Sequence, residues 1–309
     1  MSMKATVDVR TALKEGMALL RDARVASHTL AAELLLMHVL GRDRTWLYTH
    51  TEEAIEPAAA ENYFGLVSQR AAGEPTQYLT GKQEFWGLEF EVTPAVLIPR
   101  PETEHVVEVA LERLGSRGIK IDMVTGAPSP GLRVADVCTG SGCLAVALAY
   151  ELPHAKIIAT DISGAALHVA RRNATRHGVA DRVHYNEVDL LAGVLDENPS
   201  GGNAGQLFDL IVSNPPYIAQ SDAAELPREV REHEPHVALF GGASGIEIYA
   251  RLIEQAGLLL APGGILVLEL GYNSAEHVLA LVARQAAWKK IAVTSDLAGI
   301  PRVFAAERT

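Results

Sequence analysis

The residues best suited to chemistry in this chain are Asn214-Pro215-Pro216-Tyr217, which follow a strongly apolar run. The prolines fix their own φ angles, donate no backbone hydrogen bond and push Asn214 toward an extended conformation, so the turn is stiff. The side-chain oxygen of Asn214 and the carbonyl of Pro215 can accept both protons of one NH2 group, and the ring of Tyr217 offers a stacking face. This combination predicts a pocket for an amide or an aminobase. The alternative is an ordinary turn after a strand, since Asn-Pro opens many turns.

A second candidate site is the turn Asp136-Val-Cys138-Thr139-Gly140-Ser141-Gly142, between a predicted strand and a predicted helix. Its glycines let the backbone approach a ligand at the helix N-terminus. Gly140-x-Gly142-x-x-Ala matches the dinucleotide fingerprint, and Asp161 after the next strand can accept hydrogen bonds from ribose hydroxyls. This spacing does not separate NAD from S-adenosylmethionine. Asp136 and Asp189 favour the cationic sulfonium over a pyrophosphate; the alternative for Asp136, compatible with that role, is to cap the helix or tie the loop.

Two further sets of polar residues are weaker candidates. Arg100 and Glu102, flanked by prolines, lie in a stiff turn that we expect to line the cofactor or substrate entrance; a surface salt bridge is the alternative. His233 and His236 have the spacing of metal ligands, but a lone His-x-x-His in a proline-containing loop is usually solvated, and we predict no metal.

The elements that must position these residues divide the chain. The apolar spacing from about Val7 to Ala72 is helical, and Thr29 to Leu40 forms a helix closed by Gly41. Glycines and alternating apolar residues from Gly73 to Thr93 predict a β-hairpin. We therefore expect a helical domain at residues 1–74, a linker with a hairpin at 75–100, and a cofactor-binding domain at 101–309.

After Leu132 strands alternate with helices, which predicts an α/β fold with a mostly parallel sheet covered on both faces. The segment 220–244 after the Asn-Pro-Pro-Tyr turn is expected to fold over the site. The predicted helices are 143–152, 164–177 and 246–261, and the predicted strands are 132–137, 156–160, 183–188, 208–213 and 264–270.

Composition limits the function. The chain has 309 residues, a formal net charge of −11 and no marked Lys/Arg cluster at either end, which argues against binding to nucleic acid backbones. Its 2 cysteines are too few for a disulfide framework, and no apolar run approaches the roughly 20 residues of a membrane span. We expect a cytoplasmic protein and a monomer.

Together these motifs resemble the class I S-adenosylmethionine-dependent methyltransferases, and more specifically the release factor glutamine methyltransferases. The likeness spans nearly the whole chain. It is carried by the glycine turn, Asp161 and the Asn214 to Tyr217 motif, and by four further segments, namely Gly73 to Phe90, Leu97-Ile-Pro-Arg100-Pro-Glu102-Thr-Glu104, Glu234-Pro-x-x-Ala-Leu239 and Gly299-Ile-Pro-Arg-Val303.

The resemblance implies a Rossmann-like fold with a seven-stranded sheet and methyl transfer to the glutamine of the Gly-Gly-Gln motif in peptide chain release factors. It implies that Asn214 and the Pro215 carbonyl hold the glutamine NH2, that Tyr217 packs on the amide, and that the helical domain helps to recruit the substrate. Cys138 stands where many relatives carry glycine; a small thiol fits there if its φ is negative, and we expect Cys138 to be a packing residue rather than a nucleophile. The cofactor contacts implied or expected involve Asp136, Cys138, Thr139, Gly140, Ser141, Gly142, Asp161, Ile162, Asp189, Leu190 and Asn214; the substrate contacts involve Asn214, Pro215, Pro216, Tyr217, Arg100 and Glu102.

Other functions stay open at this point. A ribosomal-protein glutamine methyltransferase is the nearest rival, although Arg100 to Glu104 favours release factors. A nucleic-acid amino-methyltransferase could use the same turn on a flipped base, but the chain lacks a basic surface or a target-recognition domain. An NAD-dependent oxidoreductase fits the glycine spacing without an evident hydride-transfer motif, and the intact Asn214 to Tyr217 set speaks against a noncatalytic cofactor-binding module.

Overall fold

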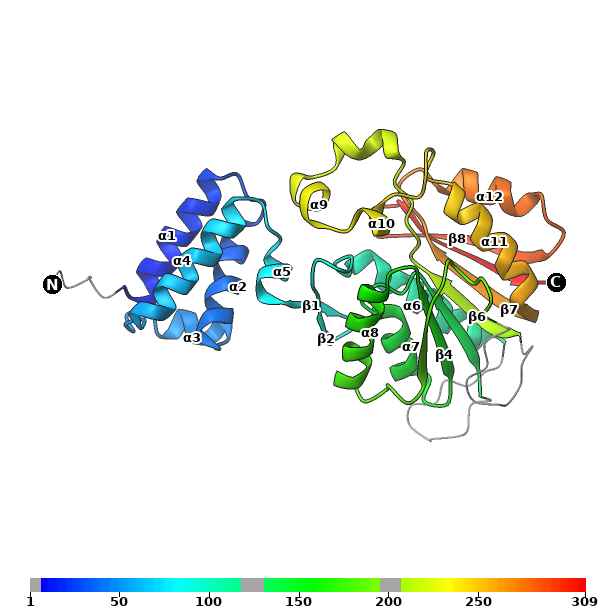
Figure 1. Ribbon diagram of the computed structural model, residues 1–309, viewed down its shortest axis with the longest axis horizontal. Coiled ribbons are helices and arrows are strands. Elements are labelled where there is room, and N and C mark those ends of the chain that lie inside the picture. The colour runs from blue at the N-terminus through cyan, green and yellow to red at the C-terminus, as the bar shows by residue number, and fades with distance from the viewer. Residues whose placement is uncertain (1–6, 118–130, 195–206) are drawn as a thin grey trace. The chain divides into compact units, whose positions relative to one another are not determined.

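A computed structural model describes residues 7–117, 131–194 and 207–309 of the chain (Figure 1). Contacts divide the chain into two compact units. The smaller unit comprises Met1–Lys82 and Pro227–His233, and the larger comprises Gln83–Leu226 and Glu234–Thr309. The proposed domain limits at residues 74 and 100 remain predictions.

Helices form the smaller unit. They are α1 (Val9–Asp22), α2 (His28–Leu40), α3 (Arg44–Thr49), α4 (Pro57–Ala71), α5 (Thr76–Thr80) and α9 (Arg228–His233). Asp8 caps α1 by accepting a hydrogen bond from the Thr11 backbone at 2.7 Å, and Gly41 closes α2 with a φ of 62°. The fully buried Tyr63 packs against Gly16, where a Cβ would collide with its ring. The apolar face of each long helix therefore packs into one core.

Two local features of the smaller unit were not predicted. The turn of helix α5 interrupts the segment expected to be only a hairpin, because Pro75 starts it and Gly81, with a φ of 72°, ends it. The segment Pro227–His233 returns to this unit, where Glu229 pairs with the buried Arg70. The hairpin itself is formed by β1 (Lys82–Phe85) and β2 (Leu88–Glu91).

The larger unit contains a sheet of 7 strands in the order β5-β4-β3-β6-β7-β9-β8. The pairs joining β5, β4, β3, β6 and β7 are parallel, while β9 is antiparallel to both of its neighbours. The α/β class, the mostly parallel sheet and the seven strands are confirmed. The strands are β3 (Arg133–Val137), β4 (Lys156–Asp161), β5 (Val183–Glu187), β6 (Phe208–Ser213), β7 (Leu260–Glu269), β8 (Trp288–Ser295) and β9 (Pro301–Arg308).

Side chains of alternate strand residues pack on opposite faces of this sheet. Val134, Val212 and Val267 join one hydrophobic core with α6 and α7, whereas their neighbours Ala135, Ile211 and Leu266 join another with α11 and α12. Figure 1 shows helices on both sides of the strands. The helices of this unit are α6 (Glu104–Ser116), α7 (Cys143–Glu151), α8 (Gly164–Arg176), α10 (His236–Leu239), α11 (Glu247–Leu259) and α12 (Ala275–Ala283), with 3₁₀ turns η1 (Pro101–Thr103) and η2 (Gln220–Glu225).

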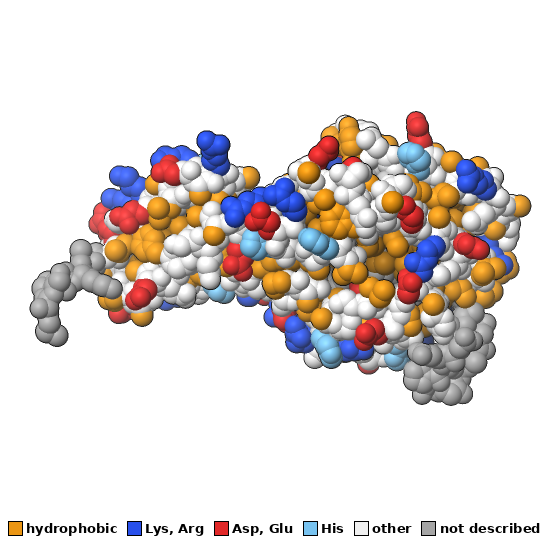
Figure 2. All heavy atoms as spheres, turned by 45° about the horizontal axis from the view of Figure 1, so that its top comes forward, with side chains coloured by type: hydrophobic (Ala, Val, Ile, Leu, Met, Phe, Trp, Pro, Cys, Tyr) orange, Lys and Arg blue, Asp and Glu red, His pale blue; other side chains and the backbone are white. Residues whose placement is uncertain are grey.

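The surface view in Figure 2 shows acidic and basic side chains interspersed with hydrophobic ones on the face that it displays. Within the described ranges no helix combines the length and the apolar character needed to cross a membrane.

Candidate active site

The register of the sheet brings the two sequence motifs together. Val137 at the end of β3 pairs with Thr160 of β4 on one side and with Ser213 of β6 on the other. The Ser213 hydroxyl also donates to the Val137 carbonyl at 2.6 Å. The residues that follow this row are therefore neighbours at one edge of the sheet, where the strand order reverses and ligands bind in open α/β sheets. These residues are Asp161, Cys138 and Asn214.

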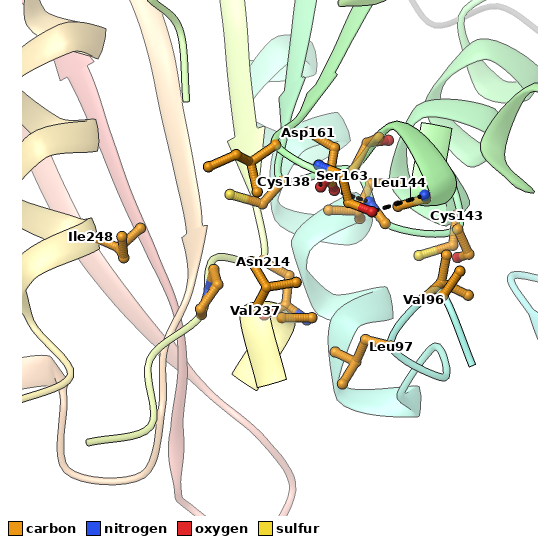
Figure 3. Close-up of a pocket in the computed structure, with 18 of the residues that line it drawn as sticks. Val96, Leu97, Cys138, Cys143, Leu144, Asp161, Ser163, Asn214, Val237 and Ile248 are labelled. Carbon is orange, nitrogen blue, oxygen red and sulfur yellow. Dashed lines mark hydrogen bonds between the residues drawn. The ribbon is translucent and has the colours of Figure 1, made fainter. Parts of the chain in front are cut away.

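A cavity of about 250 Å³ opens at this edge. Figure 3 shows Asn214 on its wall between Cys138 and Val237. The cavity thus joins the glycine turn to the Asn-Pro-Pro-Tyr turn in one space. The residues named from the sequence that line it are Cys138, Thr139, Gly140, Ser141, Asp161, Ile162, Asp189, Leu190, Asn214 and Pro216.

The other residues named from the sequence lie outside this lining, and each has a different place. Gly142 begins α7 with a φ of 81°, and a Cβ on it would lie 3.0 Å from that of Ala170. Pro215, within the turn, is buried. The remaining four, described below, are Asp136, Tyr217, Arg100 and Glu102.

Asp136 is fully buried and ties the glycine turn. Its Oδ2 accepts hydrogen bonds from the Thr139 hydroxyl at 2.6 Å and from the Ala145 backbone N–H at 3.0 Å. Its Oδ1 has no hydrogen-bond partner among the described residues. Burial raises the pKa of this carboxyl to about 7, against the effect of those hydrogen bonds. These contacts match the loop-tying role considered for Asp136.

Asp161 shapes the opposite side of the cavity. Its carboxylate accepts from the backbone N–H groups of Gly140 and Ser163, each at 2.9 Å. It keeps lone pairs for a further donor, since an ionised carboxylate offers about four acceptor positions. A Cβ on Gly140 would meet no atom within 4 Å, so the turn leaves room for a ligand directly above its backbone. Burial raises the pKa of Asp161.

Asp189 lies at the rim of the cavity. It is exposed and pairs with Arg251 at 2.5 Å, so its charge is partly neutralised by a cation of α11. The exposed Ile162 and the buried Leu190 add apolar surface on the same wall.

Cys138 adopts a φ of 61°, in the left-handed region. The negative φ under which the thiol was expected to fit is therefore not adopted. A side chain other than glycine costs about 1–2 kcal/mol in this conformation, and here the turn between β3 and α7 imposes it. Burial, together with the Asp161 and Asp136 carboxylates, raises the pKa of the thiol, which keeps it protonated and a poor nucleophile.

Asn214 is held by residues that the sequence analysis did not single out. Its Nδ2 donates to the Thr103 hydroxyl at 3.1 Å, and that hydroxyl donates to Glu269 Oε2 at 2.6 Å. Thr103 and Glu269 are only 1% and 3% exposed. Burial raises the pKa of Glu269 to about 7, with hydrogen bonds from Thr103 and Tyr217 and the charge of Arg302 opposing the rise and Glu102 adding to it. A charged residue in the apolar run of β7 was the signal available in the sequence.

The Tyr217 ring packs against the chain at Gly271. Its hydroxyl lies 3.4 Å from Glu269 Oε1, and a Cβ on Gly271 would come within 2.6 Å of its ring. The absence of a side chain at position 271 therefore lets the ring lie flat against the chain after β7. Burial raises the pKa of Tyr217 above its usual range, so the phenol stays neutral.

The end of α10 and the residues after it form hydrogen bonds with the backbone that follows the turn. Ile218 N–H donates to the Leu239 carbonyl at 2.9 Å, and Gly241 N–H donates back to the Ile218 carbonyl at 3.0 Å. A Cβ on Gly241 would collide with the Pro216 carbonyl oxygen. Val237, Ala238 and Phe240 complete the cavity wall, as expected for part of the segment 220–244.

Arg100 and Glu102 contribute to the frame of the site. Arg100 pairs with the buried Glu234, whose second oxygen accepts from Ile98 N–H at 3.3 Å. Glu102 is half-buried in η1. Burial lowers the pKa of Arg302, but the hydrogen bond and charge of Asp296, with a smaller contribution from the charge of Glu102, raise it overall. His233 and His236 belong to different units, and the described ranges contain no group of three potential metal-ligating side chains.

Comparison with known proteins agrees with this geometry. Residues 11–81 match the PrmC N-terminal domain and residues 123–230 match the methyltransferase small domain. The release factor glutamine methyltransferase of Koribacter versatilis is 41% identical over 303 residues, covering 98% of this chain and 97% of that protein. The protein of the same name from Moorella thermoacetica is 42% identical over 300 residues, covering 97% and 98%.

Among solved structures, the N-terminal domain of human METTL16 in complex with SAH covers 79% of this chain and 83% of its own, with a TM-score of 0.50 and 18% identity. That likeness concerns the fold alone. The identity to the curated relatives, which extends over both units and almost their full length, is decisive, and the chain belongs to the release factor glutamine methyltransferase family.

Proposed function

We propose that this chain transfers a methyl group from S-adenosylmethionine to the side-chain amide nitrogen of the glutamine in the Gly-Gly-Gln motif of peptide chain release factors. The observation that carries the proposal is the position of Asn214 on the wall of the cavity formed by the glycine turn, with its NH2 committed to Thr103. The names of the full-length relatives support the same reaction and substrate.

The cavity residues fit the proposed cofactor. When bound, S-adenosylmethionine supplies an electrophilic methyl group on a positively charged sulfur. The open space above Gly140 and the free lone pairs of Asp161 suit a ribose hydroxyl. The apolar side chains of Ile162 and Leu190 suit an aromatic base on the same wall. The walls carry the carboxylates of Asp161 and Asp189, and their cation Arg251 is paired with Asp189, which suits a cationic sulfonium better than a pyrophosphate.

The substrate amide would be held by the Asn-Pro-Pro-Tyr turn. Because Nδ2 of Asn214 donates to Thr103, its Oδ1 remains as an acceptor for one substrate proton. The carbonyl of Pro215 would accept the other, and the ring of Tyr217 would pack against the amide plane. The hydrogen bonds of Ile218 and Gly241 keep this turn in place without help from the substrate.

A carboxamide nitrogen is a weak nucleophile because its lone pair is delocalised. Two acceptors on its protons favour a pyramidal nitrogen, and alignment with the methyl carbon is worth up to about 7–11 kcal/mol in well-oriented model reactions. The nitrogen lone pair forms the new N–C bond, the electrons of the broken S–C bond stay on sulfur, and one N–H proton then leaves to water. Asn214 and Pro215 act by orientation, so no general base is required.

The remaining parts have supporting roles in this proposal. The helical unit recruits the release factor, and the Arg100–Glu234 pair fixes the loop that borders the cavity. We place the enzyme in the cytoplasm, as a monomer that needs neither a metal nor nucleic acid.

The test is incubation with methyl-labelled S-adenosylmethionine, a purified release factor and the same release factor with alanine in place of the glutamine of its Gly-Gly-Gln motif. We expect label only on the first protein, on that glutamine by mass spectrometry. A ribosomal protein mixture and duplex DNA serve as competing substrates. Equal labelling of both release factor forms, or preferential labelling of DNA or a ribosomal protein, would contradict the proposal.

A further inference from the structure

We propose that Thr103 and Glu269 are positioning residues that fix the orientation of the Asn214 amide, so that its oxygen rather than its NH2 faces the substrate. This inference rests on the proposed function for the identity of the substrate group. It concerns a relay of three side chains from segments far apart in the sequence, namely η1, the end of β7 and the turn after β6.

The relay is a continuous chain of hydrogen bonds. Asn214 Nδ2 donates to Thr103 Oγ1 at 3.1 Å, and Thr103 Oγ1 donates to Glu269 Oε2 at 2.6 Å. The inner bond is short, as expected when a hydroxyl donates to a carboxylate. Both inner residues are almost completely buried, so water does not compete for these positions.

The direction of the relay follows from the number of protons. A threonine hydroxyl has one proton, and here Glu269 takes it. The hydroxyl can then offer only lone pairs to Asn214, which must present its NH2 to form the second bond. The amide oxygen is consequently turned to the other side of the Asn214 side chain, where it can accept a proton from the substrate.

Packing alone does not select this orientation, because the oxygen and nitrogen of an amide are nearly equal in size and shape. Without the carboxylate, the Thr103 hydroxyl could rotate and donate to the Asn214 oxygen. The flipped amide would then face the substrate NH2 with its own NH2, placing donor against donor. The carboxylate therefore sets the polarity of the site two hydrogen bonds away.

Thr103→Val and Thr103→Ser form a matched pair for the test. Valine keeps the shape of threonine without the hydroxyl, while serine keeps the hydroxyl. We expect Thr103→Val to lower kcat for the release factor about 10- to 100-fold, the range found when a hydrogen-bond partner that orients a metal ligand is lost. We expect Thr103→Ser to stay within about threefold, with cofactor affinity by calorimetry unchanged in both. Should the valine variant fail to fold, Thr103→Ala takes its place.

A double-mutant cycle tests whether the two residues act as one relay. Glu269→Gln introduces an NH2 that can donate to Thr103 and so permits the reversed chain; alone it should lower kcat. In the Thr103→Val background it should add no further loss of kcat, because the link to Asn214 is already broken. Multiplicative losses would overturn the relay.

An NMR measurement separates the relay from the proposed function. The side-chain NH2 resonances of Asn214, identified by their loss in Asn214→Ala, should shift in Thr103→Val and stay in place in Thr103→Ser, with or without activity. If the wild type methylated the release factor and the two Thr103 variants had equal spectra and equal kcat, the relay would be refuted and the proposed function would stand. If the wild type did not methylate the release factor but the NMR shift was observed, the relay would stand and the proposed substrate would be wrong.

Discussion

Asp136 and Glu269 are both buried carboxylates close to the same edge of the sheet, and burial raises the pKa of each to about 7. Their partners differ. Asp136 binds Thr139 and Ala145, which lie 3 and 9 residues away in the chain. Glu269 binds Thr103, which lies 166 residues away. One carboxylate stabilises a local turn, and the other joins distant segments behind the proposed substrate site.

Asp136 and Glu269 are similarly buried and have similarly raised pKa values, yet they have different structural roles. In the proposed function, the Asp136 contacts shape the backbone that would face the cofactor, whereas the Glu269 contacts orient a side chain that would face the substrate amide. We therefore expect substitutions near Asp136 to affect folding and cofactor affinity. Substitutions in the relay of Asn214, Thr103 and Glu269 should affect the rate of methyl transfer.

The largest effect is expected from substitution of Asn214, the residue of the relay that would contact the substrate. Asn214→Ala removes the acceptor that orients the substrate amide, so methyl transfer should fall at least about a hundredfold, the scale of removing one aligned polar group. Binding of S-adenosylmethionine should remain measurable by calorimetry, because the glycine turn is untouched. Near-normal turnover in this variant would show that Asn214 does not hold the substrate.

A smaller effect on catalysis is expected from substitution of Asp136, the carboxylate that stabilises the glycine turn. Asp136→Ala leaves the Thr139 hydroxyl and the Ala145 N–H without their acceptor, which should lower the free energy of unfolding by about 1–3 kcal/mol. Cofactor affinity should weaken, while kcat at saturating cofactor should change only a few-fold. Urea unfolding and calorimetry measure these quantities.

Asp136→Asn is the matched control for that variant, because it keeps an acceptor oxygen and the shape of the side chain. It should lose less stability than Asp136→Ala. If Asp136→Ala instead lowered kcat and left stability unchanged, the contrast between the two carboxylates would be lost.

The smallest effect is on the pH dependence of stability. Both carboxyls titrate near pH 7 in the folded state, but release their protons near their ordinary pKa values of 3.8 and 4.5 in the unfolded chain. The unfolded state thus binds fewer protons between about pH 4 and 7, so the free energy of unfolding should fall as pH rises through this window and level off above it.

Unfolding curves of Glu269→Gln and Asp136→Asn between pH 4 and 8 check this expectation. Each substitution should remove part of the wild-type slope and leave the region above pH 7 parallel to the wild type. Identical slopes in all three proteins would mean that these carboxyls titrate normally.

Much of the fold could be predicted from the sequence. The alternation of strands and helices predicted β3, β4, β5 and β6 to within a residue or two at each end. Buried parallel strands are rich in apolar residues, as in β4 and β6, whereas β5, at the edge of the sheet, is mostly polar. The same reasoning explains why the chemistry-bearing residues after β3, β4 and β6 meet, since they follow the carboxyl ends of neighbouring strands.

The features of the fold and the site that were not predicted depend on tertiary contacts, which local sequence patterns do not contain. Glu269 lay inside the predicted strand 264–270, and only its pairing with the distant Thr103 gives it a role. The φ of Cys138 is left-handed because the turn, rather than the residue type, decides it. The return of Pro227–His233 to the helical unit likewise follows from contacts such as that between Arg70 and Glu229.

The proline after Asn214 has a consequence for the chemical lifetime of the site. Asparagine ordinarily deamidates when the backbone nitrogen of the next residue attacks the side-chain carbonyl, and this attack needs an N–H. Pro215 has none, so that route is closed. An aspartate at position 214 could not donate to Thr103 in its ionised form. The same ring that stiffens the turn therefore protects its amide against ageing.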